Sequence, residues 1–499
     1  MATLIGVDVG TTGVRAVAVG EGGELLASET ESYPLSMPRP RWTEQDPGQW
    51  WEGTRKVLGR VAAKVGDVAG LGLTGQMHGS VFLDREDRVI RPALLWNDQR
   101  TDAQCEEITR RVGAARLLEI AGNPALTGFQ APKILWLRDE EPDNFDRLAR
   151  VLLPKDYIRL RLTGELGTDV SDASGTLLLD VRRRTWSPEL LEALHLSSDL
   201  LPPVFEGSEI TGTVSDGVAD ELGLPRGLPV AAGGGDNAAA AVGIGVVEKG
   251  LASSSIGTSG VLFAHTAEFT PDQSGRIHAF GHAVTGAYHV MGVTLAAGAS
   301  LAWWRDVAAA GADFSALADS AAKAPVGAEG LLFLPYLSGE RSPHLDPHAR
   351  GAFVGLTARH DRAHLTRAVM EGVVFSLRDC FEIVRDLGVP VDQMRAIGGG
   401  ARHPLWLQLQ ADIYGVPVTK VAVDEGPAYG AALLAGIGSG RLGGFADAAQ
   451  LVRTLGVIEP DEQRKQRYDE LFVLYRELYR PLSPHMRRLS EISTSGTAP

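Results

Sequence analysis

The chain has 499 residues, of which 44% are apolar and 22% are charged, and its formal net charge is −14. This length predicts at least two domains of ordinary size, and the composition is typical of a globular protein. Clustered Lys and Arg give nucleic-acid and anionic-membrane binders their affinity, so the acidic balance argues against both classes. With only Cys105 and Cys380 in the chain, the sequence predicts neither a disulfide framework nor a thiolate metal site.

The N-terminal residues enter a strand pattern directly, without a basic stretch followed by an apolar one. No uncharged apolar run reaches the length of about 18 residues that a spanning helix needs. We therefore expect no membrane segment and a reducing, cytoplasmic environment.

The first structural signal is a strand pair. A buried strand pattern over 4–9 breaks at Gly-Thr-Thr-Gly, residues 10–13, and resumes over 14–19, with a third strand expected over 24–30. In one interpretation the break is an ordinary hairpin turn. In the other, its backbone N–H groups and Thr hydroxyls surround a phosphate, and Asp8 holds Mg²⁺ through a water molecule.

The remaining elements are read from apolar periodicity and turn residues. Helices are expected over 48–64, 102–120, 153–163, 364–384, 404–413, from 426 onward, and over 460–479. Further strands are expected over 71–75, 81–83 and 228–233. We interpret Asp169, Asp172 and Ser174 mainly as capping and turn residues.

Met77 and His78 lie at a turn between two of these strands. A lone histidine is more often structural than functional. His78 would gain a function as the wall of a polar pocket, where its ring can donate to or accept from a hydroxyl group.

A triple-glycine turn precedes Asp236 at the start of an alanine-rich helix. Glycines let the backbone approach a ligand closely, and the free N–H groups of a helix start suit anions. Asp236 is either a helix N-cap or a base that takes a proton from a sugar hydroxyl while ATP donates a phosphoryl group.

The Gly-Thr turn of residues 10–13 recurs as Gly-Thr-Ser-Gly at 257–260. Each copy follows a β-branched residue and precedes Val, but Ser255 takes the position of Asp8. Unless the match is coincidental, two such hairpins predict two domains of like topology that face one nucleotide. A third glycine run, 398–400, either lies flat against an adenine or ribose or serves helix packing.

Together these motifs resemble the FGGY carbohydrate kinases over residues 3 to about 480, and 351–371 is similar to the second signature of that family. The resemblance implies an α/β, two-domain actin-like ATPase (ribonuclease H-like) fold, with duplicated domains around a nucleotide cleft. The implied division is a sugar-binding domain 1–248, a nucleotide-binding domain 249–445, a helical extension 446–489 and a disordered tail 490–499.

Four segments are similar to those of the family members that phosphorylate D-xylulose: residues 42–47, 75–79, 233–239 and 334–344. Glycerol kinases typically have an Arg-Glu pair in place of Met77-His78, which favours a pentulose. The resemblance implies ATP-dependent formation of D-xylulose 5-phosphate with Asp236 as general base, Mg²⁺ near Asp8, and a homodimer. It places Met77, His78, Asp236 and Asn237 at the sugar. It places these residues at ATP: Thr11, Thr12, Gly257, Thr258, Gly298, Gly399 and Gly400.

One departure is His403, where related kinases usually have Ser, and it bears on the lining of the adenosine side. Three alternatives stay open: a kinase for another ketose, a pentitol or gluconate; an actin-like ATPase without a sugar substrate; and a sugar-sensing transcriptional regulator. The regulator would need a basic DNA-binding extension, which the sequence does not predict.

Overall fold

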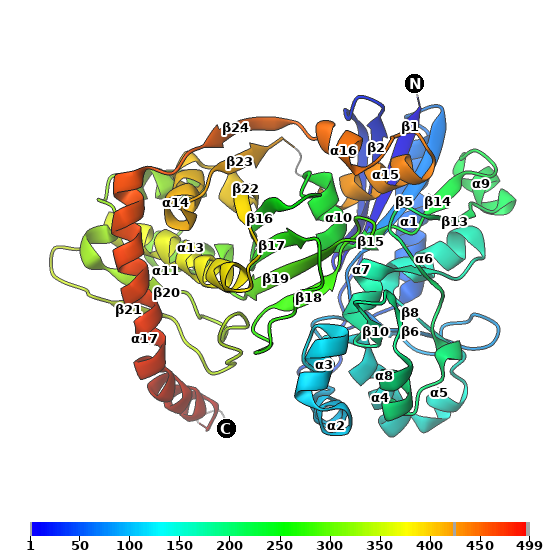
Figure 1. Ribbon diagram of the computed structural model, residues 1–499, viewed down its shortest axis with the longest axis horizontal. Coiled ribbons are helices and arrows are strands. Elements are labelled where there is room, and N and C mark those ends of the chain that lie inside the picture. The colour runs from blue at the N-terminus through cyan, green and yellow to red at the C-terminus, as the bar shows by residue number, and fades with distance from the viewer. Residues whose placement is uncertain (1, 423–425, 496–499) are drawn as a thin grey trace.

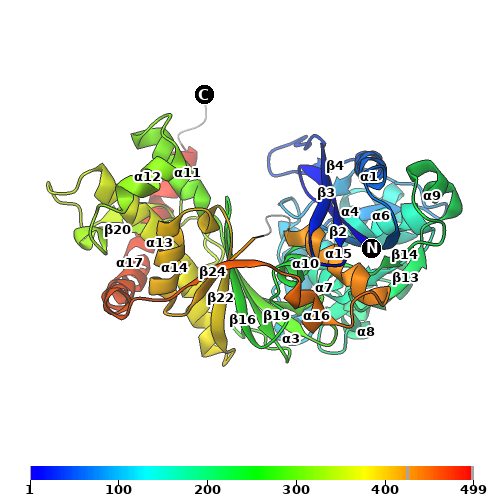
Figure 2. The same cartoon turned by 90° about the horizontal axis from the view of Figure 1, so that it is seen from above.

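The computed structural model describes residues 2–422 and 426–495 of the chain. It has two lobes, each built on a seven-stranded sheet (Figures 1 and 2). The first sheet contains β1 (Thr3–Val9), β2 (Gly13–Gly20), β3 (Leu25–Ser32), β5 (Val68–Gly75), β13 (Ile210–Thr213), β14 (Pro229–Ala231) and β15 (Gly234–Gly235). The second contains β16 (Gly250–Ile256), β17 (Gly260–Thr266), β18 (His278–Gly281), β19 (Tyr288–Thr294), β22 (Val391–Gly398), β23 (Val418–Val421) and β24 (Thr454–Ile458).

The two sheets have the same topology. The first runs β3-β2-β1-β5-β14-β13 and the second β19-β17-β16-β22-β23-β24. In both, the first two neighbouring pairs are antiparallel, the next two are parallel, and the last is antiparallel. The duplicated α/β fold expected from the two Gly-Thr turns is therefore confirmed.

Both Gly-Thr turns close antiparallel hairpins, as predicted. In the first, the N–H of Gly10 donates to the carbonyl of Gly13 at 3.0 Å; in the second, that of Gly257 donates to Ser259 at 3.0 Å. The apolar strand residues behind each turn are buried, so packing on both faces of the sheet fixes the register of the hairpins.

Helices α10 (Asp236–Gly243) and α15 (Gly426–Gly438) cross at the junction of the lobes. They pack backbone against backbone: a Cβ atom on Gly430 would stand 1.8 Å from the carbonyl oxygen of Ala239. α15 also packs on β1 and β5 of the first sheet, which Figure 2 shows from above. The predicted boundary at 248/249 stays a prediction. After β23 of the second sheet, α15 packs on the first sheet, and β24 then pairs with β23 in the second sheet again.

The helices surround the sheets. In the first lobe they are α1 (Pro47–Ala62), α2 (Asp102–Val112), α3 (Ala114–Ala121), α4 (Gln130–Glu140), α5 (Pro142–Asp146), α6 (Pro154–Thr163), α7 (Val170–Ala173), α8 (Pro188–Leu194) and α9 (Asp216–Leu222). The later ones are α11 (Gly298–Ala308), α12 (Phe314–Ala321), α13 (Arg362–Asp386), α14 (Pro404–Tyr414), α16 (Phe445–Gln450) and α17 (Glu462–Ser495). Short strands complete the fold: β4 (Glu44–Gln45), β6 (Val81–Leu83), β7 (Ala93–Leu94), β8 (Arg150–Leu152), β9 (Thr168–Asp169), β10 (Leu179–Asp180), β11 (Thr185–Trp186), β12 (Val204–Phe205), β20 (Leu332–Leu334) and β21 (Ala352–Val354).

The single helix expected over 102–120 is wrong, because the chain forms α2 and α3 there. Gly113 separates them with a φ of 89°, a conformation that glycine adopts readily and that no α-helix contains. Within the described residues no helix combines the length and apolarity that a membrane crossing requires.

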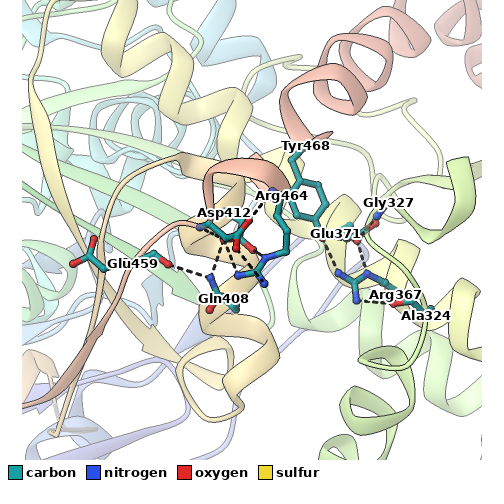
Figure 3. A network of polar contacts seen from close by, with 10 residues as sticks. Ala324, Gly327, Arg367, Glu371, Gln408, Asp412, Glu459, Arg464 and Tyr468 are labelled. Atoms are coloured by element: carbon teal, nitrogen blue, oxygen red, sulfur yellow. Dashed lines mark hydrogen bonds and ion pairs between the residues drawn. The ribbon is translucent and has the colours of Figure 1, made fainter. Parts of the chain in front are cut away.

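The C-terminal helix α17 is fixed to the second lobe by buried and partly buried polar contacts (Figure 3). The Tyr468 hydroxyl donates to Glu371 at 2.7 Å and accepts from Arg367 at 2.9 Å, while Arg464 pairs with Asp412 at 2.6 Å. The extension expected over 446–489 thus holds strand β24 as well as helix.

The disordered tail expected from residue 490 is contradicted over 490–495, where α17 continues. Ser490 is buried and accepts a hydrogen bond from Arg350, which anchors this last part of the helix. The rest of the expected tail, 496–499, lies outside the described residues.

Candidate active site

Parallel strands bring Asp8 and Asp236 to one edge of the first sheet. Asp8 in β1 is paired with Thr74 of β5, and Gly235 of β15 is paired with Gly75 of the same strand. Because the carboxyl ends of parallel strands meet at one edge, Asp236 emerges beside Asp8. Their charges interact: Asp236 raises the pKa of Asp8.

Asp8 is a largely buried carboxyl group with spare bonding capacity. Its Oδ1 atom is buried and has no hydrogen-bond partner among the described residues. Burial and, to a smaller extent, the Asp236 charge raise the pKa of Asp8 to about 7, against the charge of Arg15, which lowers it. A buried carboxylate oxygen without a partner suits a divalent cation, which would lower that pKa again.

Asp236 is the first residue inside α10, and Gly235 holds the N-cap position. The N-cap interpretation of Asp236 is therefore wrong. Its Oδ1 accepts from the backbone N–H of Asn237 at 2.7 Å and from the side-chain amide of Asn237 at 2.8 Å. Burial, opposed by the two Asn237 hydrogen bonds, raises the pKa of Asp236 to about 6. Such a carboxylate is ionised at neutral pH and basic enough to accept a proton.

A cleft of about 290 Å³ joins Asp236 to the second lobe. Its walls come from α10, from β16, β17 and β22 of the second sheet, and from the start of α15. The lining includes Asp236, Asn237, Ser253, Ser255, Gly398 and Arg402. A ligand in this cleft would therefore contact both lobes.

Met77 and His78 lie on the first-lobe side of Asp236. A Cβ atom on Gly235 would stand 2.9 Å from the side chain of Met77, so Met77 packs directly under the turn that carries Asp236. His78 donates its Nδ1–H to the carbonyl of Gly175 at 2.7 Å and packs on the ring of Phe129 at 4.6 Å.

His78 is neutral and has a fixed tautomer. Burial, helped by the charges of Lys133 and Arg341, lowers the pKa of His78 to about 3, against the Gly175 hydrogen bond, which raises it. Because the carbonyl of Gly175 can only accept, the proton is on Nδ1 and Nε2 is an acceptor. His78 therefore offers an acceptor to a hydroxyl group.

The glycine-rich segments of the second lobe converge. The N–H of Gly298, at the start of α11, donates to the carbonyl of Gly257 at 2.7 Å. The carbonyl of Thr258 accepts from the N–H groups of Ala297 and Ala299, on either side of Gly298. A Cβ atom on Gly400 would stand 2.6 Å from Ile256, and Gly399 lies over the same residue. The fold thus gathers the predicted nucleotide residues of this lobe around one hairpin.

The two threonines of the first hairpin differ. Thr11 is engaged from three sides: its hydroxyl donates to Gln76 and accepts from Trp96, and its carbonyl accepts from Gln45. Thr12 is exposed at the tip of the turn. Of the pair, Thr12 is therefore the residue more accessible to a ligand.

Several neighbours of the site were missed by sequence reasoning. Gly175 and Phe129, which hold His78, are distant in sequence and carry no motif that could have found them. The polar residues that hold Thr11 gave a weak signal, since Gln45 and Gln76 lie in two of the segments with family similarity. His403 caps α14, with Nδ1 accepting from the N–H of Leu405 at 3.1 Å, so it keeps the helix-capping ability of the serine usual at that position.

Comparisons with known proteins identify the family of the chain. The model of the FGGY family of carbohydrate kinases matches with its N-terminal domain over residues 3–243 and with its C-terminal domain over residues 252–439. The chain therefore belongs to the FGGY family of carbohydrate kinases. It is an α/β carbohydrate kinase of the two-domain actin-like fold, and the family implies ATP as the phosphoryl donor.

Among characterised relatives, the xylulose kinase of Escherichia coli is 43% identical, with 97% of this chain and 99% of that protein covered. The xylulose kinase of Bacillus subtilis is 41% identical over 96% of this chain and 97% of that protein. The crystal structure of xylulose kinase from Rhodospirillum rubrum is similar with a TM-score of 0.92 and 33% identity, covering 97% of this chain and 99% of that one.

Proposed function

We propose that this kinase transfers the γ-phosphoryl group of ATP to the primary 5-hydroxyl of D-xylulose. The observation that carries the proposal is the position of Asp236, on the wall of the interlobe cleft and directly above Met77. The full-length similarity to proteins named xylulose kinase supports this choice of acceptor. A kinase for another ketose, a pentitol or gluconate would use the same framework.

Asp236 is the general base in this proposal. A primary hydroxyl is a poor nucleophile at neutral pH, and a carboxylate within hydrogen-bond reach assists by about 10²- to 10⁴-fold. The hydroxyl proton passes to Asp236 as the new oxygen–phosphorus bond forms and the bond to the β-phosphate oxygen breaks, with ADP as the leaving group. Partial burial keeps Asp236 basic enough for this role, with a pKa of about 6.

The residues around Asp8 fit Mg²⁺. The buried Oδ1 without a partner provides the hard oxygen ligand that Mg²⁺ prefers, directly or through water. When bound, Mg²⁺ neutralises charge on the transferring phosphoryl group. Since Ser255 stands where the second half would have an equivalent acid, Asp8 alone supplies this carboxylate in the pair of hairpins.

The sugar contacts in this proposal come from the first lobe. Nε2 of His78 accepts from a sugar hydroxyl, and Met77 and Asn237 complete the wall next to Asp236. Thr12, Thr258 and the glycines at 257, 298, 399 and 400 face ATP. A homodimer and a cytoplasmic location belong to the proposal as family-based expectations, and light scattering on the purified chain tests the first.

The test is a coupled assay of ADP release with Mg·ATP and a panel of D-xylulose, L-xylulose, D-ribulose, L-ribulose, glycerol, gluconate and D-arabitol. We expect D-xylulose to give the highest kcat/KM. A preference for another polyol would overturn the sugar assignment while leaving Asp236 as the base. Sugar-independent ADP release alone would instead favour an actin-like ATPase.

A further inference from the structure

A buried serine holds the turn that carries Asp236. Ser171 lies in the short helix α7, is fully buried, and accepts the backbone N–H of Gly235 at 3.0 Å through its hydroxyl oxygen. The same hydroxyl donates to Asp169 at 2.5 Å. Because Gly235 immediately precedes Asp236, this pair of hydrogen bonds fixes the peptide from which the Asp236 side chain projects.

A cluster of buried ions anchors Asp169 in turn. The ammonium group of Lys155 lies 2.9 Å from Asp169, 2.5 Å from Asp156 and 3.4 Å from Asp172, and all four side chains are fully buried. We refer to Lys155, Asp156, Arg159, Asp169 and Asp172 as the buried ion cluster.

Arg159 extends the cluster to the other side of the turn. It donates to the backbone carbonyls of Ala231 and Ala232, at 3.1 and 2.5 Å, at the end of the strand that leads into the triple-glycine turn. The segment from 231 to 235 is therefore held at both ends by the same cluster.

The acids of the cluster interact electrostatically with one another and with Asp236. Burial raises the pKa of Asp172 well above its usual range, and so do the charges of Asp156, Asp169 and Asp236, while Lys155 lowers it. Burial also raises the pKa of Asp156, against the charges of Lys155 and Arg159.

Capping alone does not account for this arrangement. Asp169 does cap α7, as predicted, accepting from the N–H groups of Ser171 and Asp172. A helix cap needs neither a buried lysine nor a serine hydroxyl bonded to a neighbouring strand. A buried ion cluster also often stabilises a protein no more than apolar residues of the same volume would. The cluster is better explained by the precise placement of the turn that it holds.

We infer that Ser171 is a positioning residue for phosphoryl transfer: it connects the Lys155–Asp169 pair to the Gly235 peptide and so fixes where the Asp236 carboxylate meets the sugar hydroxyl. The inference rests on the proposed role of Asp236 as the base. A base misplaced by about 1 Å can lose about 10²-fold in rate while substrate binding is kept. Ser171 thus acts on kcat through Asp236 without touching the substrates.

Ser174 provides a matched control. It is one helical turn away, equally buried, and its hydroxyl also accepts a backbone N–H, that of Gly281 in β18, at 2.9 Å. Ser174→Ala therefore removes the same group with the same burial but leaves the Asp236 turn intact. Ser171→Cys keeps nearly the size of serine while replacing the hydroxyl with a poor acceptor.

The experiment measures kcat, KM for both substrates and thermal midpoints for Ser171→Ala, Ser171→Cys and Ser174→Ala. We expect the two Ser171 variants to lose about 10- to 100-fold in kcat with KM values within about twofold. Ser174→Ala should lose similar stability and keep its kcat. Should Ser171→Ala fail to fold, Ser171→Cys still carries the comparison.

Two results would overturn the inference: a Ser171 variant with full kcat, or kcat losses equal in the Ser171 and Ser174 variants. Asp236→Asn, measured in parallel, separates this failure from that of the proposed function. If Asp236→Asn is inactive while the Ser171 variants are fully active, only the positioning role is wrong. If Asp236→Asn keeps wild-type turnover, the base assignment is wrong and the positioning role falls with it.

Discussion

Replacing Asp236 with Asn should inactivate the kinase and stabilise its fold. Burial raises the pKa of Asp236 from 3.8 to about 6, so the folded protein holds a charge at neutral pH that the unfolded chain solvates better. A shift of roughly two units corresponds to about 3 kcal/mol, and partial exposure of the side chain reduces this to about 1–3 kcal/mol. Asn can still accept the two hydrogen bonds from Asn237, so little else is lost.

The gain in the free energy of unfolding of Asp236→Asn should increase with pH. Asp236 has a raised folded-state pKa, so its stabilising contribution is present below pH 3.8 and is lost as the pH rises through 6. The difference between Asp236→Asn and the wild type should therefore be near zero at pH 4, grow between pH 4 and 6, and stay constant above. Urea unfolding in metal-free buffer across this range measures it.

Asp216→Asn is the matched control, since Asp216 is likewise the first residue of a helix, α9, but its side chain is 71% exposed. Asp216→Asn should be no more stable than the wild type, because an exposed acid at a helix N-terminus is favourable. The reasoning is refuted if Asp236→Asn is no more stable than wild type at pH 8, or if its gain is the same at pH 4.

Three further outcomes follow from the same contacts. As a general base Asp236 must be ionised, so log kcat/KM should fall with unit slope below about pH 6, which a pH–rate profile checks. Asp8→Asn should raise the Mg²⁺ concentration needed for half-maximal rate by about tenfold or more, because it removes a carboxylate from the ion. A Mg²⁺ titration at fixed ATP measures this concentration, and the same value in variant and wild type would contradict the prediction. Tyr468→Phe deprives buried Glu371 of a donor and should lower the free energy of unfolding by about 1–3 kcal/mol, while Tyr479→Phe, at a partly buried hydroxyl, should lower it less.

The sequence predicted the parts of the fold that depend on local signals. The Gly-Thr hairpins, the triple-glycine turn and the long helix α13 follow from residues close together in the chain, and all three are present. The duplicated topology followed because the same local signal occurs twice. Where a single glycine decided the outcome, as Gly113 does between α2 and α3, periodicity alone favoured one helix over two.

The supports of the site could not be predicted in the same way. His78 depends on Gly175, and Gly235 on Ser171, through contacts that span 97 and 64 residues. Such pairs leave no periodic pattern, because each partner is placed by a different element. Likewise, the sequence places Ser490 in a polar tail, and only the fold shows that Arg350 lies beside it.

The duplication also bears on which half of the chain binds the sugar and which binds the nucleotide. α10 follows β14 and the short strand β15, and α15 follows β23, which holds the place of β14 in the second sheet. The first helix opens with Asp236 and the second with Gly426. The hairpins differ in the same sense, Asp8 against Ser255. Both carboxylates therefore belong to the first half, while the second half offers glycine backbone and hydroxyl groups. A base must face the hydroxyl that it deprotonates, and backbone N–H and hydroxyl groups bind a polyphosphate without the repulsion of a free carboxylate. The asymmetry therefore favours our proposal that the sugar binds at the first lobe and the nucleotide mainly at the second.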